Sequence, residues 1–227
     1  MAKRARSKRP YHSPRRREQA DATRRAILGA AQRLFGDRGY AATSMAAIAS
    51  EAGVALKTVY VAFGTKHGLL RTLWHLLLRG DQGDAPVGER GWFRAVLEEP
   101  DPERALRLNV RNAKLVRARI GRLLEVIREA ATTEPEVAEL WTRIQTEFYE
   151  NQRSVIESLH RRGALRPGLG VAPAADILWT LNSPAVYQQL VRDRGWKPDQ
   201  HERWLADVLC SELLGAAPSD TGMGGNG

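Results

Sequence analysis

The stretch of sequence that decides the fold is residues 43–66, which read TSMAAIASEAGVALKTVYVAFGTK. Within it, Ala49, Gly53 and Val59 stand at the offsets that a helix-turn-helix requires. The small Ala49 lets two helix backbones approach where they cross, and Gly53 can adopt the positive φ that ends the first helix. Val59 is expected to face back onto Ile48. The pattern therefore predicts two short helices that cross through a tight turn.

The two helices are predicted at about residues 44–52 and 56–62, with Thr43 or Ser44 as the N-cap of the first. Both hydroxyls would lie at a helix N-terminus, where they are good donors to a phosphate; capping alone is the other interpretation. The residues left pointing outward from the second helix, where a DNA groove would lie, are Leu56, Lys57 and Thr58.

Two side chains of the second helix suit contacts to DNA. Lys57 matches the O6 and N7 acceptors of guanine, and a contact to phosphate alone is the alternative. Tyr60 can place its hydroxyl on a phosphate, or it can pack against Phe35 or Phe63 with its tip in water. These features make the second helix the predicted DNA-reading element.

The N-terminus carries most of the net charge of the chain. Of the nine net positive charges, eight come from Lys and Arg residues within positions 1–17, a segment that contains no acidic residue. Such blocks are typically disordered and often bind nucleic acid, although a solubilising tail has the same composition. Because the segment leads into the helix-turn-helix, we expect it to bind DNA, with Arg15, Arg16 and Arg17 among its contacts.

Composition excludes several other classes of protein. The chain has 227 residues and a single cysteine, Cys210, so an intrachain disulfide is impossible and a reducing, cytoplasmic location is expected. No apolar stretch approaches the roughly 20 residues of a membrane span, so no membrane partner is expected. The five histidines are scattered without metal-ligand spacing, and no glycine-rich phosphate loop follows a strand. We therefore predict no enzyme activity, no metal and no cofactor.

Apolar residues recur with the helical period throughout, which predicts an all-α protein. The predicted divisions are a disordered basic arm at 1–18, a helix-turn-helix DNA-binding domain at 19–79, a linker at 80–91, a helical regulatory and dimerisation domain at 92–214 and a disordered tail at 215–227. The linker is placed on the run GDQGDAPVGERG, which is rich in Gly, Pro and Asp.

Punctuating residues predict the individual helices. The first should run from about Asp21 to Asp37 and end at Gly39, and a fourth should begin after Gly64-Thr65. The remaining helices are expected over 103–131 as one or two helices, from Pro135 to about Arg162, from Pro173 onward with a break at Ser183-Pro184, and from Pro198 to Leu214.

The long helix after Pro135 contains the signal for a ligand pocket. Its apolar stripe is interrupted by Asn151 and Gln152, and an apolar cavity with a few polar groups is typical of a ligand site. A surface polar patch or a hydrogen-bonded core amide is the alternative. The candidate lining residues are Trp92, Phe93, Leu124, Ile127, Trp141, Ile144, Phe148, Asn151 and Gln152.

The last two helices carry more large apolar residues than one core-facing stripe requires. This excess predicts a two-fold interface, built as a four-helix bundle with two helices from each subunit. The alternative is that both faces close the core of the monomer. The candidate interface residues are Ile177, Leu178, Trp179, Leu181, Trp204, Leu205, Val208 and Leu209.

One run of residues resembles a known family. The run comprises Thr43, Ile48-Ala49, Ala52-Gly53-Val54, Thr58-Val59-Tyr60, Phe63, Lys66 and Leu69-Leu70. It resembles the N-terminal domain of the TetR family of transcriptional regulators over about residues 20–75, and the match beyond is architectural. The resemblance implies that residues 56–62 are the recognition helix and that Lys66 contacts phosphate. The chain departs from the family pattern at Ala55, Lys57 and Ala62.

Members of this family are homodimers, usually repressors, that bind palindromic operators and are released by a small molecule. The expected function is therefore a ligand-responsive repressor with three partners: an operator in double-stranded DNA, a second copy of the chain and an unidentified small-molecule effector. Two other functions stay open. They are a non-specific or architectural DNA-binding protein that relies on its basic arm, and a constitutive regulator without a ligand.

Overall fold

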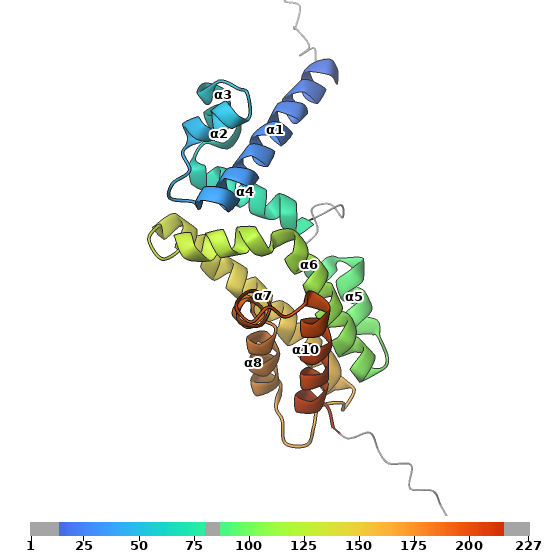
Figure 1. Cartoon of the computed structure of the whole chain (residues 1–227). Coiled ribbons are helices and arrows are strands. Elements are labelled where there is room, and N and C mark those ends of the chain that lie inside the picture. Colours follow the sequence, from blue (N-terminus) through green and yellow to red (C-terminus); the bar gives the residue numbers. More distant parts are fainter. Residues whose placement is uncertain (1–13, 80–86, 216–227) are drawn as a thin grey trace, which may run out of the picture. The chain divides into compact units, whose positions relative to one another are not determined.

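The computed structural model describes residues 14–79 and 87–215 and is helical throughout, apart from one isolated β-bridge between Leu165 and Leu214 (Figure 1). This confirms the predicted all-α class. The chain forms two compact units, Met1–His75 and Leu76–Gly227, which are described separately. Their boundary falls inside a helix. The last turn of that helix belongs to the second unit, in which Arg90 Nη1 donates to the carbonyl of Leu78 at 2.6 Å. Residues 80–86 of the predicted linker lie outside the described residues, so the linker stays a prediction.

The first unit consists of helices that enclose a small apolar core. The helices are α1 (Pro14–Arg38), α2 (Met45–Glu51), α3 (Leu56–Phe63) and α4 (Lys66–Arg79), the last of which continues into the second unit. The core side chains with no exposed surface are Ile27, Ala30, Ala31, Phe35, Ile48, Val59, Leu69, Leu70 and Leu73. Each helix contributes one stripe to this core, as the helical period predicted.

Helix α1 begins at Pro14, well before the predicted start near Asp21. The prediction that residues 14–18 belong to a disordered arm is therefore wrong. Proline fits the first turn of a helix, and the Arg, Glu, Gln and Ala residues that follow it are good helix formers. Residues 1–13 lie outside the described residues, as does the tail from residue 216, and their predicted disorder stays a prediction.

The second unit is larger and is built on two long helices. Its elements are the short 3-10 turn η1 (Val87–Glu89), α5 (Gly91–Glu98), α6 (Pro102–Ala130), α7 (Pro135–Arg161), α8 (Val171–Leu181), α9 (Pro184–Tyr187), the π-helical turn η2 (Gln188–Asp193) and α10 (Pro198–Leu213). The segment predicted as one or two helices over 103–131 is the single helix α6. The core of this unit draws side chains from α5, α6, α7, α8 and α10.

The predicted break at Ser183-Pro184 is confirmed. The Ser183 hydroxyl caps α9 by accepting the backbone N–H of Val186 at 3.3 Å, and Pro184 occupies the first helical turn. Because Val186 bonds to Ser183, the carbonyl of Asn182 loses its helical donor. Arg117 Nη2 replaces it at 3.0 Å and also reaches Asn182 Oδ1 at 3.2 Å. A cation at the C-terminus of α8 is electrostatically favourable as well.

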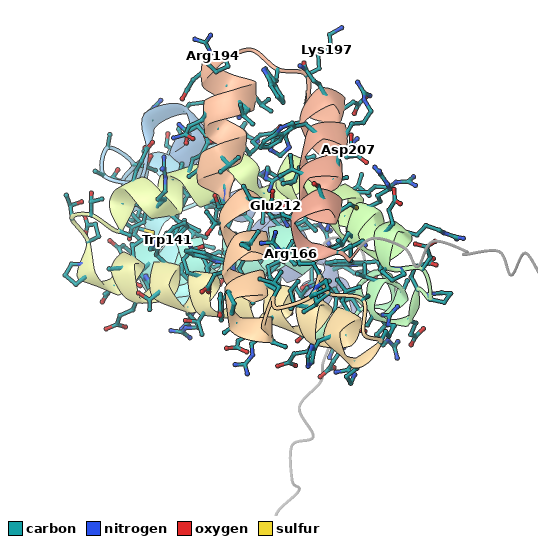
Figure 2. The ribbon with its side chains drawn as sticks, turned by 90° about the horizontal axis from the view of Figure 1, so that it is seen from below. Trp141, Arg166, Arg194, Lys197, Asp207 and Glu212 are labelled. Atoms are coloured by element: carbon teal, nitrogen blue, oxygen red, sulfur yellow. The ribbon has the colours of Figure 1, made fainter. Side chains whose placement is uncertain are left out.

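Beyond the break, the chain passes through η2 and returns as α10, which lies beside the α8–η2 column (Figure 2). Within residues 14–79 and 87–215, no single helix is both long enough and apolar enough to cross a membrane. In this described part of the chain, only the bent pair α2 and α3 reaches the required length and composition when the two are counted together.

Candidate functional site

Helices α2 and α3 have the geometry of a helix-turn-helix, with an angle of 111° between them. Gly53 has φ of 67° and ends the first of them, as its sequence position predicted. Ser44 is the N-cap of α2, and its hydroxyl accepts the N–H of Ala47 at 3.1 Å. Ala55 provides no side-chain cap for α3. The turn therefore depends on glycine and on packing rather than on a second cap.

The outward face of α3 carries the side chains predicted to read DNA. Val59 is fully buried and anchors the helix, whereas Lys57 is exposed and Thr58 is partly exposed. Tyr60 exposes 49% of its surface, so it is not buried against Phe35. The ring neighbour of Phe35 is Tyr40 instead, at 5.5 Å. Lys57, Thr58 and Tyr60 thus lie together and are available to a partner.

Thr43 is the exception among the predicted phosphate contacts. It is only 1% exposed, and its hydroxyl donates to the carbonyls of Gly39 at 2.8 Å and Leu34 at 3.2 Å. Its role is to tie the end of α1 to the start of α2, so its assignment to the DNA-facing set is wrong. The neighbouring Ser44 is exposed and stays in that set.

Two cations hold α3 and the start of α4, and only one was singled out from the sequence. Lys66 Nζ donates to the carbonyl of Tyr40 at 3.0 Å and lies 4.1 Å from the centre of its ring. Arg24 lies 4.6 Å from the ring of Phe63 and donates to the last turn of α3, at Ala62 O. Arg24 was missed because no local pattern links residues so far apart in the chain.

Gly68 is a second missed residue. A Cβ atom at this position would collide with the carbonyl oxygen of Phe63. Glycine therefore lets α4 begin directly beneath the end of α3. Of the three arginines assigned to the arm, Arg17 is exposed on α1, whereas the side chains of Arg15 and Arg16 lie outside the described part of the chain.

Most of the residues predicted to line a ligand pocket are buried or partly buried in the second unit. Phe93, Leu124, Ile127 and Ile144 are buried, and Trp92, Phe148 and Asn151 are partly buried. Gln152 is 4% exposed, and its Oε1 accepts from Asn109 Nδ2 at 3.1 Å and from Asn182 Nδ2 at 3.4 Å. For Gln152 the alternative is correct: it is a hydrogen-bonded core amide.

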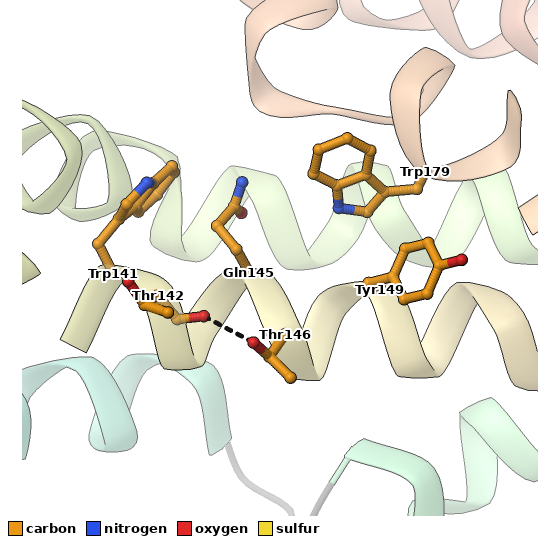
Figure 3. Close-up of a pocket in the computed structure, with 6 residues that line it drawn as sticks. All are labelled: Trp141, Thr142, Gln145, Thr146, Tyr149 and Trp179. Carbon is orange, nitrogen blue, oxygen red and sulfur yellow. Dashed lines mark hydrogen bonds between the residues drawn. The ribbon is translucent and has the colours of Figure 1, made fainter. Parts of the chain in front are cut away.

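A different hollow of about 480 Å³ opens beside α7 and α8 (Figure 3). Its lining residues are Trp141, Thr142, Gln145, Thr146 and Tyr149 from α7 and Trp179 from α8. Trp141 is the only one of the predicted pocket residues among them. The other lining residues were not predicted from the sequence, because those on α7 form a stripe beside the core-facing one. The spacing of four residues between 141, 145 and 149 places these side chains on one face of α7 and is the signal that could identify them.

Figure 3 shows Trp141 and Trp179 on opposite sides of Gln145. The Trp179 indole Nε1 is buried without a hydrogen-bond partner, and its ring meets that of Tyr149 edge-on at 6.3 Å. Burial, together with a hydrogen bond to Asp176, raises the pKa of the Tyr149 hydroxyl. The hollow is therefore aromatic, is lined by no charged side chain and has one unused donor.

Polar groups also gather inside the second unit, where α6, α9 and α10 meet. Arg117 stacks 4.6 Å from the ring of Tyr187 and forms no ion pair with any described carboxylate. Burial lowers the pKa of its guanidinium to about 10. His201 packs on Tyr187 at 5.1 Å, and burial, followed by the charge of Arg117, lowers the pKa of its imidazole to about 4. His201 is therefore neutral at physiological pH.

The residues predicted for a dimer interface divide into two groups. Leu178, Leu205 and Leu209 are fully buried in the core of their own unit, so their assignment to an interface is wrong. The alternative, that these faces close the monomer, holds for them. The residues that keep some exposed surface are Ile177, Trp179, Leu181, Trp204 and Val208.

A helix-turn-helix whose second helix turns Lys57, Thr58 and Tyr60 outward, followed by a helical second unit, defines the class of helix-turn-helix transcriptional regulators. Residues 27–73 match the family model described as "Bacterial regulatory proteins, tetR family". The chain is 30% identical over 217 residues to the regulator TtgR of Pseudomonas putida, covering 92% of this chain and 93% of TtgR. The chain belongs to the TetR family, which makes it a transcriptional regulator and not an enzyme.

Two further relatives agree with this assignment. The regulator EthR of Mycolicibacterium smegmatis is 25% identical over 213 residues, covering 90% of this chain and 92% of EthR. The crystal structure of NalD, the secondary repressor of the MexAB-OprM multidrug efflux pump in Pseudomonas aeruginosa, is 26% identical with a TM-score of 0.65. That alignment covers 87% of this chain and 98% of NalD.

Proposed function

We propose that the protein is a ligand-responsive repressor that binds a palindromic operator as a homodimer and is released by a small molecule bound to its second unit. The observation that carries the proposal is the outward face of α3, where Lys57, Thr58 and Tyr60 are available on a helix-turn-helix. Repression is supported by NalD, which is similar over most of both chains.

In this proposal each part of the first unit has its own contact to DNA. Lys57 and Thr58 meet base edges in the major groove. Ser44, Tyr60 and Lys66 meet phosphates, which set the register without reading sequence. The basic segment, including Arg15, Arg16 and Arg17, adds contacts to phosphate or to the minor groove.

The homodimer is proposed on α8 and α10, through the half-buried residues that the core leaves available. Ile177 and Leu181 on α8, with Trp204 and Val208 on α10, are candidates for a four-helix interface. Arg194 and Lys197 lie at one end of this helix pair, whereas Glu212, near the end of α10, lies beside its ion-pair partner Arg166 (Figure 2).

The effector site is proposed at the hollow between Trp141 and Trp179. An uncharged, flat aromatic compound with a hydrogen-bond acceptor fits its chemistry, because the lining provides aromatic faces and the unused Trp179 N–H. Such a compound would weaken operator binding only if it binds the DNA-free conformation better than the DNA-bound one.

The test is selection of DNA from a random pool by the full-length protein, followed by titration of the selected site. We expect a palindromic site with two half-sites that is bound at least about 1,000-fold more tightly than random DNA. An architectural protein would enrich no sequence. A constitutive regulator would select the same operator, but no aromatic compound would release it, and Trp179→Ala would leave its response unchanged.

A further inference from the structure

Helix α3 exposes an unusual amount of apolar surface. Leu56, Tyr60 and Val61 are 40%, 49% and 79% exposed. Among the described residues, the exposed large hydrophobic side chains are these three together with Leu76 and Leu115. A single exposed apolar side chain needs no explanation, but three on one helix of eight residues form a patch.

The position of Val61 on the helix points it away from the core of the first unit. Successive residues turn by about 100°, so Val61 points nearly opposite to the fully buried Val59. It stands one turn after Lys57 and therefore shares its direction. The side chain of this helix that points most directly at a bound partner is thus a valine beside a lysine.

The chemistry of the major groove offers one apolar target. Each base pair presents hydrogen-bond donors and acceptors there, and the C5 methyl group of thymine is the apolar feature among them. Valine has no hydrogen-bonding group and cannot read the other features. Its exposure on the free protein is explained if a methyl group covers it in the complex.

We propose that Val61 packs against the C5 methyl group of a pyrimidine in each operator half-site and so makes operator recognition depend on that methyl group. The proposal rests on the DNA-binding function proposed above and adds a specificity-determining residue to it. One helical turn rises about 5.4 Å, so the methyl-bearing base lies within about one or two base pairs of the Lys57 contact. Thymine and 5-methylcytosine both present such a group.

The first experiment uses the operator selected by the full-length protein. Each thymine of a half-site is replaced in turn by deoxyuridine, which keeps every hydrogen-bonding group and lacks only the methyl. At one position we expect affinity to fall about fourfold per half-site, or roughly 15-fold when both half-sites are changed. A wild-type protein that binds all uracil-containing operators as tightly as the original overturns the proposal.

The second experiment assigns the methyl contact to a residue. Val61→Ala should bind the thymine and uracil operators with equal affinity, whereas the matched control Leu56→Ala on the same helix should keep the wild-type discrimination. Val61 is highly exposed, so its replacement should leave thermal unfolding unchanged. Discrimination that survives in Val61→Ala, or that disappears in Leu56→Ala instead, overturns the assignment.

A third arm identifies the source of the methyl group. With cytosine at the sensitive position, conversion to 5-methylcytosine should restore about fourfold in affinity for the wild type and nothing for Val61→Ala. No gain for the wild type overturns the methyl contact at that position. Failure of the DNA-binding function itself is distinguishable, because the wild type would then select no operator at all.

Discussion

The two units depart from the usual distribution of side chains in opposite ways. In the first unit, apolar side chains of α3 stay outside, with Val61 79% exposed. In the second unit, polar side chains lie inside: Asn109 and Asn182 are buried and donate to the buried Gln152, and His201 is buried as well. Exposed apolar and buried polar groups are the informative exceptions in a folded protein.

The difference teaches what each unit is built to do. The first unit holds α3 in place through Val59, Gly68 and the Arg24 contacts, so the outward face of α3 is set before any partner binds. The second unit combines a helix break, a π-helical turn and a buried polar network. π-turns occur often at functional sites. We therefore expect the effector-dependent change to occur here.

The largest expected effect tests the outward face. Lys57→Ala should weaken operator binding by about 2 kcal/mol per half-site, or roughly 1,000-fold for the dimer, without changing helical content. If Lys57 reads a base, repeated selection should show relaxed preference at one position per half-site, whereas a phosphate contact would weaken all sequences equally. Arg111→Ala, at an exposed cation on α6, is the control. If Lys57→Ala bound the operator with full wild-type affinity, Lys57 on the outward face of α3 would not contribute to DNA binding.

The next effect tests the inward polar network. Gln152→Leu removes the acceptor shared by Asn109 and Asn182 and leaves the buried Nδ2 group of each without it, so the free energy of unfolding should fall by about 3 kcal/mol. Denaturant titration measures this. The exposed Arg153→Ala on the same helix is the control. An unchanged midpoint for Gln152→Leu would mean that the buried network does not stabilise the unit.

A third test uses pH. The pKa of His201 is about 4 in the folded protein, below its ordinary value of 6.5, so folding favours the neutral imidazole. The contribution of the neutral His201 to the free energy of unfolding is complete above about pH 6.5 and is lost as the pH falls toward about 4. Between pH 7 and pH 5 the loss should be about 2 kcal/mol. His201→Gln should lack this loss of stability at low pH. The difference between the unfolding free energies of the wild type and the variant, measured across pH, isolates the effect of His201. Parallel pH profiles for the two proteins would argue against it.

The smallest effect concerns the basic segment. Deleting residues 1–13 leaves α1 intact from Pro14 and removes five positive charges. Operator affinity should fall about tenfold near 0.1 M salt, with a shallower dependence on salt and little change in sequence preference. Replacing the five Lys and Arg residues by Gln separates charge from length. An unaltered salt slope after deletion would assign all DNA contacts to the helix-turn-helix.

Sequence patterns predicted well wherever a residue acts on its near neighbours. Gly53 ends α2, Ser44 caps it, and Ser183 with Pro184 interrupts the chain after α8. The predicted start of α1 is too late, because a run of charge indicates disorder although the same residues form helix readily. Local preference was the better guide for residues 14–18.

The sequence also could not show which of two faces of a helix is covered. Leu178, Leu205 and Leu209 read as a second apolar face, but the core of the unit encloses them. The same limit applies to α7, where Gln152 lies in the core and the stripe through Gln145 lines the surface hollow. An amphipathic pattern reports that a face is apolar, not which neighbour covers it.

The sequence by itself determined the helical class, the helix-turn-helix and the helix breaks, because these depend on residues within one or two helical turns of each other. The tertiary structure alone decided that Thr43 is buried, that Arg24 supports α3 and that Asn109 pairs with Gln152, 43 positions away. The physical reason is that burial and hydrogen-bond pairing depend on which distant elements pack together. A local pattern is compatible with several such arrangements, and only the folded structure decides between them.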